Sequence, residues 1–215
     1  MADYIPALPV LLSFALASAI LTLTPGPDMT LFLSQTVSRS RAAGAVAYLG
    51  AATGLLLHTA FVALGLSALL VASATAFGIL KVVGALYLLW LAVDALRNGS
   101  TLRLQKNGGA RGSLGFVYLR GLLVNLLNPK VIIFFITFLP QFVSSADPFA
   151  VEKLFVLGAL YVVFIATPMS LAMVMSAGWV AGLLTRSRRA SRIVDWLFAT
   201  VLGAFAIKLL ATRAG

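Results

Sequence analysis

Hydrophobic positions in this chain fall into long runs that no charged residue interrupts. Residues 5–27, 42–80 and 154–185 carry no acidic side chain, lysine or arginine, and the second run contains the single histidine, His58. An uncharged run of 18 or more apolar residues is typical of a helix that crosses a membrane. The pattern predicts about six such helices. Their expected bounds are 5–24 with a continuation to 37, 43–71, 76–96, 118–142, 153–183 and 193–212.

Composition agrees with this pattern. The chain is 61% hydrophobic and 10% charged, whereas a soluble domain has about 25% charged residues. We therefore predict an all-α integral membrane protein. The chain has no cysteine, one histidine and six acidic residues, so we expect no metal site. It also lacks a G-x-x-x-x-G-K-[ST] loop, so we expect no bound nucleotide or other cofactor.

The net charge of +10 is concentrated between the apolar runs. Eleven of the sixteen basic residues fall in the first, third and fifth predicted loops: Arg39, Arg41, Arg97, Arg103, Lys106, Arg111, Arg120, Arg186, Arg188, Arg189 and Arg192. Basic loops stay in the cytoplasm, so these loops are predicted to be cytoplasmic and both termini extracytoplasmic. Aromatic residues do not alternate with the basic ones, which argues against a nucleic-acid partner.

The third loop divides the chain into two parts. Its sequence, NGSTLRLQKNGGARGS, is rich in glycine, serine and basic residues, a composition typical of a flexible linker. We expect a first three-helix repeat over residues 1–97, a cytoplasmic linker over 98–117 and a second repeat over 118–215. An odd number of helices gives the two halves opposite orientations, so one membrane domain of inverted repeats is predicted.

Two helix-breaking motifs interrupt the apolar runs at matching places in the two halves. Residues 24–28 spell TPGPD and residues 128–130 spell NPK, so that a shift of 102 positions aligns Pro27 with Pro129 and Asp28 with Lys130. Asparagine is a good N-cap and proline suits the first helical position. In TPGPD, Thr24 or Gly26 is expected to cap, with Pro25 or Pro27 following. Matching breaks of this kind are the best sequence pointer to a transporter binding site.

The charges at these breaks suggest a ligand. Helix N-termini offer N–H donors and partial positive charge to an anion, and Asp28 and Lys130 add one charge of each sign. A free amino acid, which is a zwitterion, would satisfy both. Two alternatives remain open at this point: the prolines are structural kinks, or Asp28 and Lys130 simply pair with each other.

Other polar residues extend the candidate site. Asn125 and Asn128 lie three residues apart on one helix face, where they line the cavity or hold helices together. His58 either relays a coupling proton, as Asp28 also could, or is a buried neutral side chain. The glycine spacings 44–50–54 and 78–84 predict close helix packing or a homodimer interface.

Three stretches together resemble the LysE-type amino-acid exporters, and in particular their homoserine/threonine-resistance branch. They are TPGPD, KVVGALYLLWLAVDALR at residues 81–97 and NLLNPKVIIFFITFLPQF at residues 125–142. The resemblance implies an inner-membrane exporter of amino acids driven by the proton motive force. The family's motif residues correspond to Pro25, Gly26, Pro27 and Asp28 in the first half, and to Asn128, Pro129 and Lys130 in the second.

These observations predict a secondary transporter that exports small amino acids. A neutral substrate is favoured because the expected cavity has no second acidic residue. Its partners would be the amino acid, protons and the lipid bilayer. The rival hypotheses are a non-transporting scaffold and an intramembrane enzyme that uses His58 with Ser67 or Ser170, although no motif brings such residues together.

Overall fold

The computed structural model describes most of the chain. The described residues are 4–24, 26–72, 112–144, 147–179 and 188–211, together with the helical positions 79, 82–83, 85–86, 89–90, 92–94 and 96–97. Every regular segment among them is helical, and none is a β-strand.

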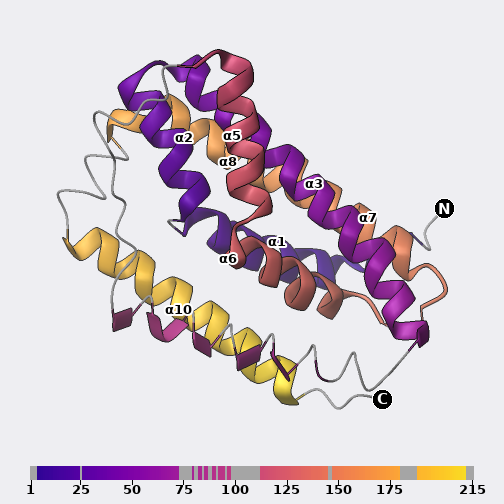
Figure 1. Ribbon diagram of the computed structural model, residues 1–215. Coiled ribbons are helices and arrows are strands. Elements are labelled where there is room, and N and C mark those ends of the chain that lie inside the picture. The colour runs from indigo at the N-terminus through magenta and orange to yellow at the C-terminus, as the bar shows by residue number, and fades with distance from the viewer. Residues whose placement is uncertain are drawn as a thin grey trace.

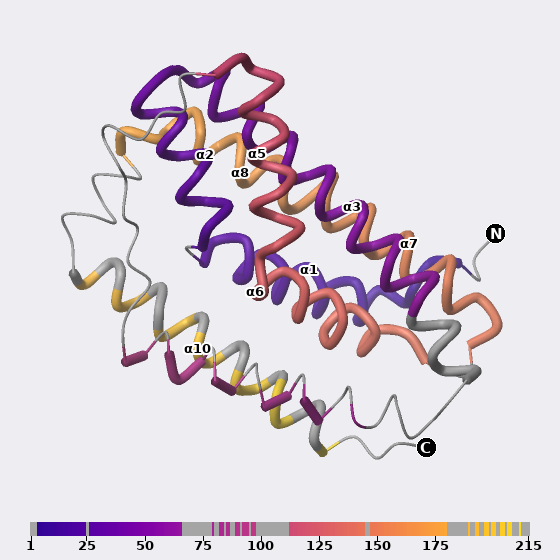
Figure 2. Tube along the Cα trace, in the orientation of Figure 1, coloured from indigo at the N-terminus to yellow at the C-terminus, as the bar shows by residue number. Residues whose placement is uncertain are grey.

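The described elements follow one another along the chain as Figures 1 and 2 show. They are α1 (Leu8–Leu23), α2 (Pro27–Ser38), α3 (Arg41–Ala72), α5 (Leu114–Leu126), α6 (Pro129–Ile133), the π-helical η1 (Phe134–Phe138), the 3-10 helical η2 (Leu139–Phe142), α7 (Ala150–Leu160), the π-helical η3 (Tyr161–Ala166), α8 (Thr167–Met175) and α10 (Arg188–Ala211).

Two of the helical segments are long and apolar enough to cross a membrane without interruption, Arg41–Gly65 and Ala150–Met175. Two further pairs meet the same criterion only when joined across a bend: α1 with α2, at 55°, and α5 with Pro129–Phe142, at 52°. The described part of the chain therefore contains between two and four candidate spans. The two bends lie at TPGPD and NPK, where the sequence predicted broken helices.

Local sequence explains why the second member of each bent pair starts where it does. Pro27 is the first residue of α2 and Gly26 its N-cap, while Pro129 is the first residue of α6 and Asn128 its N-cap. Proline lacks the N–H that the first turn leaves unpaired and has the φ angle that a helix requires. Gly26 has an extended backbone, with φ of −160°, which any residue can adopt, so the break itself does not require glycine there.

Helix α3 forms the centre of the described bundle and packs against α2, α5 and α7. Figure 1 shows α3 and α5 side by side over much of the length of α5. Two glycines permit this approach. A Cβ atom on Gly50 would lie 2.1 Å from the carbonyl oxygen of Tyr118, and one on Gly121 would lie 2.1 Å from that of Ala47. The two backbones are thus in direct contact.

The other glycines of the 44–50–54 series also face neighbours within the chain. A Cβ atom on Gly44 would meet Thr36 on α2, and one on Gly54 would lie 2.4 Å from the Oδ1 atom of Asn125 on α5. The series therefore serves helix packing, as one of the two interpretations predicted. The other spacing, 78–84, lies outside the described residues, and the homodimer stays a prediction.

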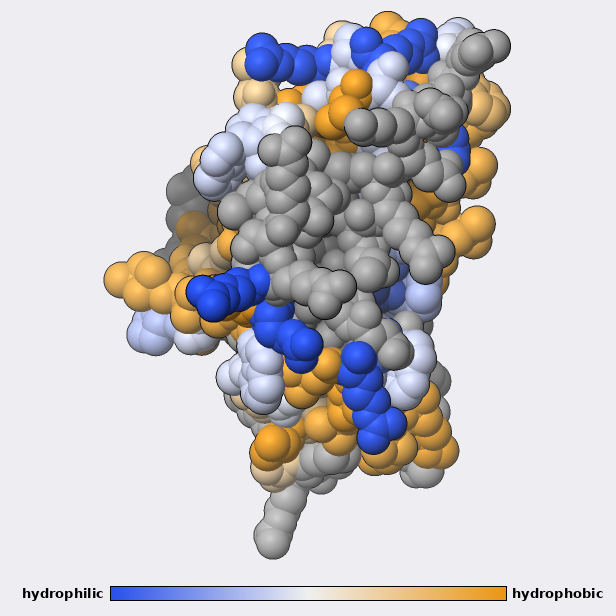
Figure 3. Space-filling model, turned by 90° about the vertical axis from the view of Figure 1, so that its left-hand side faces the viewer, coloured by the Kyte–Doolittle hydropathy of each residue, from blue (hydrophilic) through white to orange (hydrophobic). Residues whose placement is uncertain are grey.

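A hydrogen bond joins the first loop to the end of the third loop. The Arg39 guanidinium donates a hydrogen bond of 2.8 Å to the carbonyl oxygen of Gly112, which brings the first loop next to the end of the third. Figure 3 shows hydrophilic residues gathered at the end where α2 leads into α3, with a second group lower on the same face among hydrophobic side chains. Two loops predicted to share one side of the membrane thus lie together.

The loop between η2 and α7 is held by Asp147. Its carboxylate accepts hydrogen bonds from the Lys153 ammonium and, at 2.9 Å, from the backbone N–H of Phe149. Both contacts, with Lys153 the stronger, lower the pKa of Asp147 below its ordinary value. Most of the described helices begin and end within a few residues of the expected bounds. The larger differences are α8, which ends at Met175 rather than at 183, and α10, which begins at Arg188 rather than at 193. Helix α5 begins at Leu114 rather than at 118, because Ser113 accepts a hydrogen bond from the N–H of Phe116.

Adding one methyl group at the α3–α5 contact should separate the two helices. We expect Gly50→Ala to lower the stability of the detergent-solubilised protein by about 1–3 kcal/mol, because its Cβ would overlap a backbone carbonyl. Gly65→Ala is the matched control, since its Cβ would meet nothing within 4 Å. Thermal unfolding of both variants measures the difference, and equal midpoints would contradict the proposed contact.

Candidate functional site

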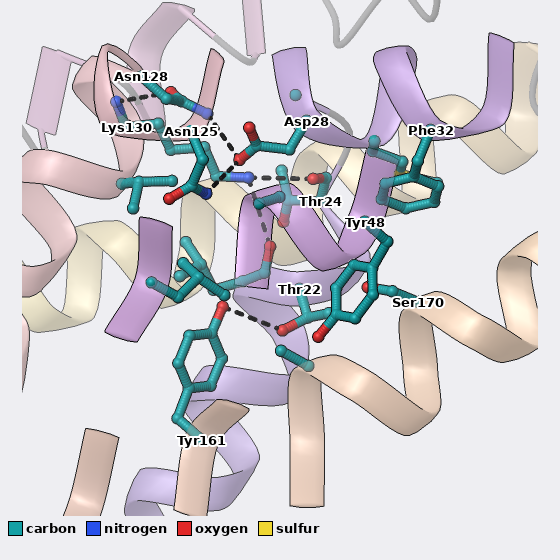
Figure 4. Close-up of a pocket in the computed structure, with 17 residues that line it drawn as sticks. Thr22, Thr24, Asp28, Phe32, Tyr48, Asn125, Asn128, Lys130, Tyr161 and Ser170 are labelled. Atoms are coloured by element: carbon teal, nitrogen blue, oxygen red, sulfur yellow. Dashed lines mark hydrogen bonds between the residues drawn. The ribbon is translucent and has the colours of Figure 1, made fainter. Parts of the chain in front are cut away.

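The Asp28 carboxylate connects the two broken spans. Asp28 is the second residue of α2, and its Oδ2 atom accepts hydrogen bonds from the Nδ2 atoms of Asn125, at 3.0 Å, and Asn128, at 3.1 Å. In Figure 4 both amides point toward this carboxylate from the end of α5 and the start of α6. The first break thus supplies an anion, and the second supplies the donors that hold it.

Asn128 has a second role at the start of α6. Its Oδ1 atom accepts a hydrogen bond of 3.0 Å from the backbone N–H of Lys130, and so caps the helix. An N-cap side chain satisfies one of the N–H groups that the first turn leaves unpaired. One amide therefore closes the second break with its oxygen and holds Asp28 with its nitrogen.

Lys130 makes the reverse connection, from the second break to the first. Its ammonium donates hydrogen bonds to the carbonyl oxygens of Leu21, at 3.3 Å, and Thr24, at 3.0 Å. Both oxygens lie at the end of α1, where Thr24 is the C-cap. The end of a helix carries partial negative charge and carbonyls without helical partners, so it is a favourable place for a cation.

Between these groups lies a small cavity of about 60 Å³, large enough for a few water molecules. Both charged groups line it, together with hydroxyl groups and apolar side chains. Its lining residues are Leu21, Thr22, Thr24, Gly26, Asp28, Met29, Phe32, Tyr48, Ala51, Leu55, Asn125, Asn128, Lys130, Val131, Tyr161, Ala166 and Ser170. Among these described lining residues, the acidic and basic side chains are Asp28 and Lys130.

The hydroxyl-bearing side of the cavity was not anticipated as a group. Thr22 Oγ1 lies 3.4 Å from the Tyr161 hydroxyl, and the Tyr48 hydroxyl lies 2.8 Å from Thr167 Oγ1. Figure 4 shows Thr22, Tyr48, Tyr161 and Ser170 around the end of the cavity away from Asn128. The sequence signal was weak, because isolated hydroxyl residues in apolar runs are common in membrane helices and only packing shows which of them share a cavity.

Two acceptors on residues that line the cavity, the Oδ1 atoms of Asp28 and Asn125, have no hydrogen-bond partner among the described residues. The Oδ1 atom of Asp28 is buried and unpaired, while Oδ2 receives both amide donors. An unsatisfied buried acceptor on a charged group is costly. The site is therefore suited to a ligand that brings a hydrogen-bond donor to Asp28.

The predicted site residues divide into three groups. Five of them line the cavity: Gly26, Asp28, Asn125, Asn128 and Lys130. Pro27 and Pro129 instead line an apolar groove that runs along α5 and touches the cavity region through Asn128. Pro25 lies outside the described residues.

His58 lies behind the cavity and does not line it. The side chain is buried, its Nε2 atom is 3.4 Å from the backbone carbonyl oxygen of Asn125, and its ring stacks on Phe135 at a centroid distance of 5.6 Å. It thus contacts the segment that holds Asp28, through the backbone. No group of three or more His, Cys, Asp and Glu side chains that could hold a metal occurs in the part of the chain that the structure describes.

Comparison with known proteins gives several related sequences. A homoserine/homoserine lactone efflux protein of Salmonella typhi is 33% identical over 136 residues, covering 63% of this chain and 66% of the relative. A threonine efflux protein of the same organism is 35% identical over 139 residues, covering 61% and 65%. The matched region thus spans just under two thirds of these relatives. No solved structure is significantly similar to the chain.

The family comparison covers far more of the chain. Residues 19–213 match the LysE type translocator family, a range that includes both breaks and every described residue that lines the cavity. This family consists of membrane translocators rather than enzymes, so the enzyme hypothesis is set aside. The match identifies the chain as a member of the LysE type translocator family.

Proposed function

We propose that this protein exports a small, neutral amino acid from the cytoplasm as a secondary transporter. The observation that carries the proposal is the placement of Asp28 and Lys130. Each comes from a different broken span, each lines the same cavity, and each has hydrogen bonds to neutral groups of the other break. Opposite charges held in this way offer one partner for each end of a zwitterion.

In this proposal Asp28 binds the substrate ammonium and Lys130 the substrate carboxylate. The unpaired Oδ1 atom of Asp28 supports the first assignment, because an ammonium would supply the missing donor. The second assignment, of the substrate carboxylate, relies on the ammonium of Lys130. The backbone N–H of Lys130 at the start of α6 could not serve instead, because it is already bonded to Asn128. The start of α2, which has no side-chain cap, adds partial positive charge near the carboxylate.

The remaining lining favours a neutral substrate with a polar side chain. A basic side chain would find no second carboxylate among the described lining residues, whereas the hydroxyls of Thr22, Tyr48, Tyr161 and Ser170 could hydrogen-bond a substrate hydroxyl. The relatives named as homoserine and threonine efflux proteins handle such compounds. We therefore propose threonine and homoserine as the first substrates to test.

We further propose that the protein consists of two inverted three-helix repeats, residues 1–97 and 118–215, in the inner membrane. The similar bends of 55° and 52°, each followed by a proline at the first helical position, support this arrangement. The basic loops would lie in the cytoplasm and the termini outside. The proton motive force would drive export. Asp28, which lines the cavity, would take up the coupling proton only when it does not hold the substrate ammonium, and His58 lies behind it.

Removing either cavity charge should abolish transport. In inverted membrane vesicles with an imposed proton gradient, wild-type protein is expected to accumulate radiolabelled threonine or homoserine. Asp28→Asn and Lys130→Ala should each lower the initial rate by at least about tenfold, because a lost hydrogen bond to a charged group costs roughly 1.5–3 kcal/mol.

Asp147→Asn and Lys153→Ala are the matched controls, since they remove an acid and a lysine from the loop before α7. Both should transport at the wild-type rate. If the cavity variants insert normally and transport as well as wild type, the site is wrongly assigned. If wild type accumulates no amino acid under any gradient, the exporter proposal fails.

The two roles of Asn128 can be separated. Asn128→Ser keeps a side-chain oxygen that can cap α6 but removes the amide that holds Asp28, whereas Asn128→Ala removes both. We expect both variants to lose transport and Asn128→Ala alone to lose about 1 kcal/mol of stability through the missing cap. Unfolding midpoints and vesicle uptake test this, and full transport by Asn128→Ser would contradict the role given to its amide.

The Tyr161 hydroxyl should help to distinguish threonine from valine, which has the same shape without a hydroxyl. We expect Tyr161→Phe to lower the ratio of threonine to valine accumulation roughly fivefold, the effect of about one hydrogen bond. Tyr118→Phe is the control, because its hydroxyl bonds Thr53 away from the cavity. An unchanged ratio in Tyr161→Phe would exclude Tyr161 as a specificity residue.

A further inference from the structure

The carbonyl oxygens at the end of α1 form a group whose chemistry differs from the rest of the cavity. Leu21 lies in the last turn of α1, and Thr24 is its C-cap with an extended backbone. The Leu21 oxygen accepts one hydrogen bond, of 3.2 Å, from the backbone N–H of Thr24. At membrane depth a carbonyl without a donor costs several kcal/mol. In transporters with broken helices, such carbonyls are the groups that bind Na⁺ or other cations.

The side chain that donates to both oxygens is Lys130, whose position is unfavourable for its own helix. Lys130 is the second residue of α6, and a cation near a helix N-terminus is repelled by the partial positive charge there. Its ammonium nevertheless reaches back to α1, at 3.0 Å from the Thr24 oxygen and 3.3 Å from the Leu21 oxygen. The carbonyls of α1 and the nearby Asp28 carboxylate supply the attraction that offsets this repulsion.

The backbone at Gly26 lies against the same ammonium. A Cβ atom on Gly26 would be 3.6 Å from Lys130 Nζ, which is an ordinary contact distance. Two carbonyl oxygens at the end of α1 therefore contact the ammonium from one side. Gly26, the residue before α2, lies next to it on another side. This is a compact place for a small cation, built from the backbone of one half of the chain and filled by a side chain of the other.

We propose that the end of α1 is a monovalent-cation site and that the ammonium of Lys130 is its permanent, tethered occupant. The site takes primary ammonium ions, which donate hydrogen bonds to carbonyls. In the wild-type protein Lys130 holds it, so free Na⁺ does not bind there. The proposal concerns cation binding and does not depend on whether the protein transports an amino acid.

The test empties the site and offers it a free cation. Lys130→Ala removes a chain equivalent to n-propylammonium, so this ion is the probe, at constant ionic strength in detergent solution. We expect Lys130→Ala to unfold at a lower temperature than wild type. Propylammonium chloride should raise its midpoint in a saturable way, by roughly 3 °C or more at ten times the dissociation constant.

Two comparisons make the result specific. Tetramethylammonium chloride carries the same charge but no N–H donors, and it should not stabilise Lys130→Ala. Lys130→Met fills the volume of the lysine chain without a charge. Its unfolding midpoint should be below that of wild type and should not change when propylammonium is added. Three results would overturn the proposal. The unfolding midpoint of Lys130→Ala could respond equally to the two ions, or it could respond to neither. Alternatively, Lys130→Met could be as stable as wild type.

A measurement on the wild-type protein keeps the proposal testable if Lys130→Ala does not fold. Unfolding midpoints of wild type in sodium chloride and in choline chloride should coincide at every concentration, because Lys130 already occupies the site. A specific, saturable stabilisation by Na⁺ would show that the carbonyls are open to free cations. Because these readouts are unfolding temperatures, they remain interpretable even if vesicle transport fails.

Discussion

A backbone that breaks inside a hydrocarbon layer must find partners for the amide and carbonyl groups that it exposes. In this protein the first break finds a donor in the second, while the helix that starts at the second break is capped by its own Asn128. Lys130 follows the second break and bonds two carbonyls at the end of α1, before the first break, while Asn128 donates to the carboxylate that follows the first break. The charged cavity follows from these contacts, because Asn128 and Lys130, which bond the open backbone groups at the breaks, also line the cavity.

The packing of the helices around the breaks holds these hydrogen-bonding groups in position. Asn125 can reach Asp28 only because α5 lies close to α3, and α3 has glycine at three of the positions where neighbouring helices approach, including Gly54 opposite the Asn125 side chain. On the other side of the cavity, the π-helical segment η3 brings Tyr161 to Thr22. π-helical turns are frequent at functional sites. Segment η3 ends two residues before Pro168, and a proline removes a regular α-helical hydrogen bond.

Much of the helical pattern and of the charged site could be predicted from sequence. The breaks at TPGPD and NPK follow from proline chemistry, and the alignment of Asp28 with Lys130 placed opposite charges at both. The partners of these charges could not be predicted, because they depend on side-chain reach across helices: the sequence allowed a direct pair, whereas the structure gives Asp28 to two amides and Lys130 to two carbonyls of α1. Tyr48, Tyr161 and Thr22 were missed for the same reason, since their shared cavity exists only after η3 packs on α1.

The close approach of Gly50 to Tyr118 and of Gly121 to Ala47 has a mechanical consequence. Where two backbones touch with no side chain between them, the helices cannot slide or rotate past each other without separating. Helix α3 belongs to the first half of the chain and α5 to the second, so this contact couples the two halves along these helices. An opening and closing of the cavity would then have to come from the short segments beyond this contact, with α1 and α6 swinging about their bends while α3 and α5 stay still.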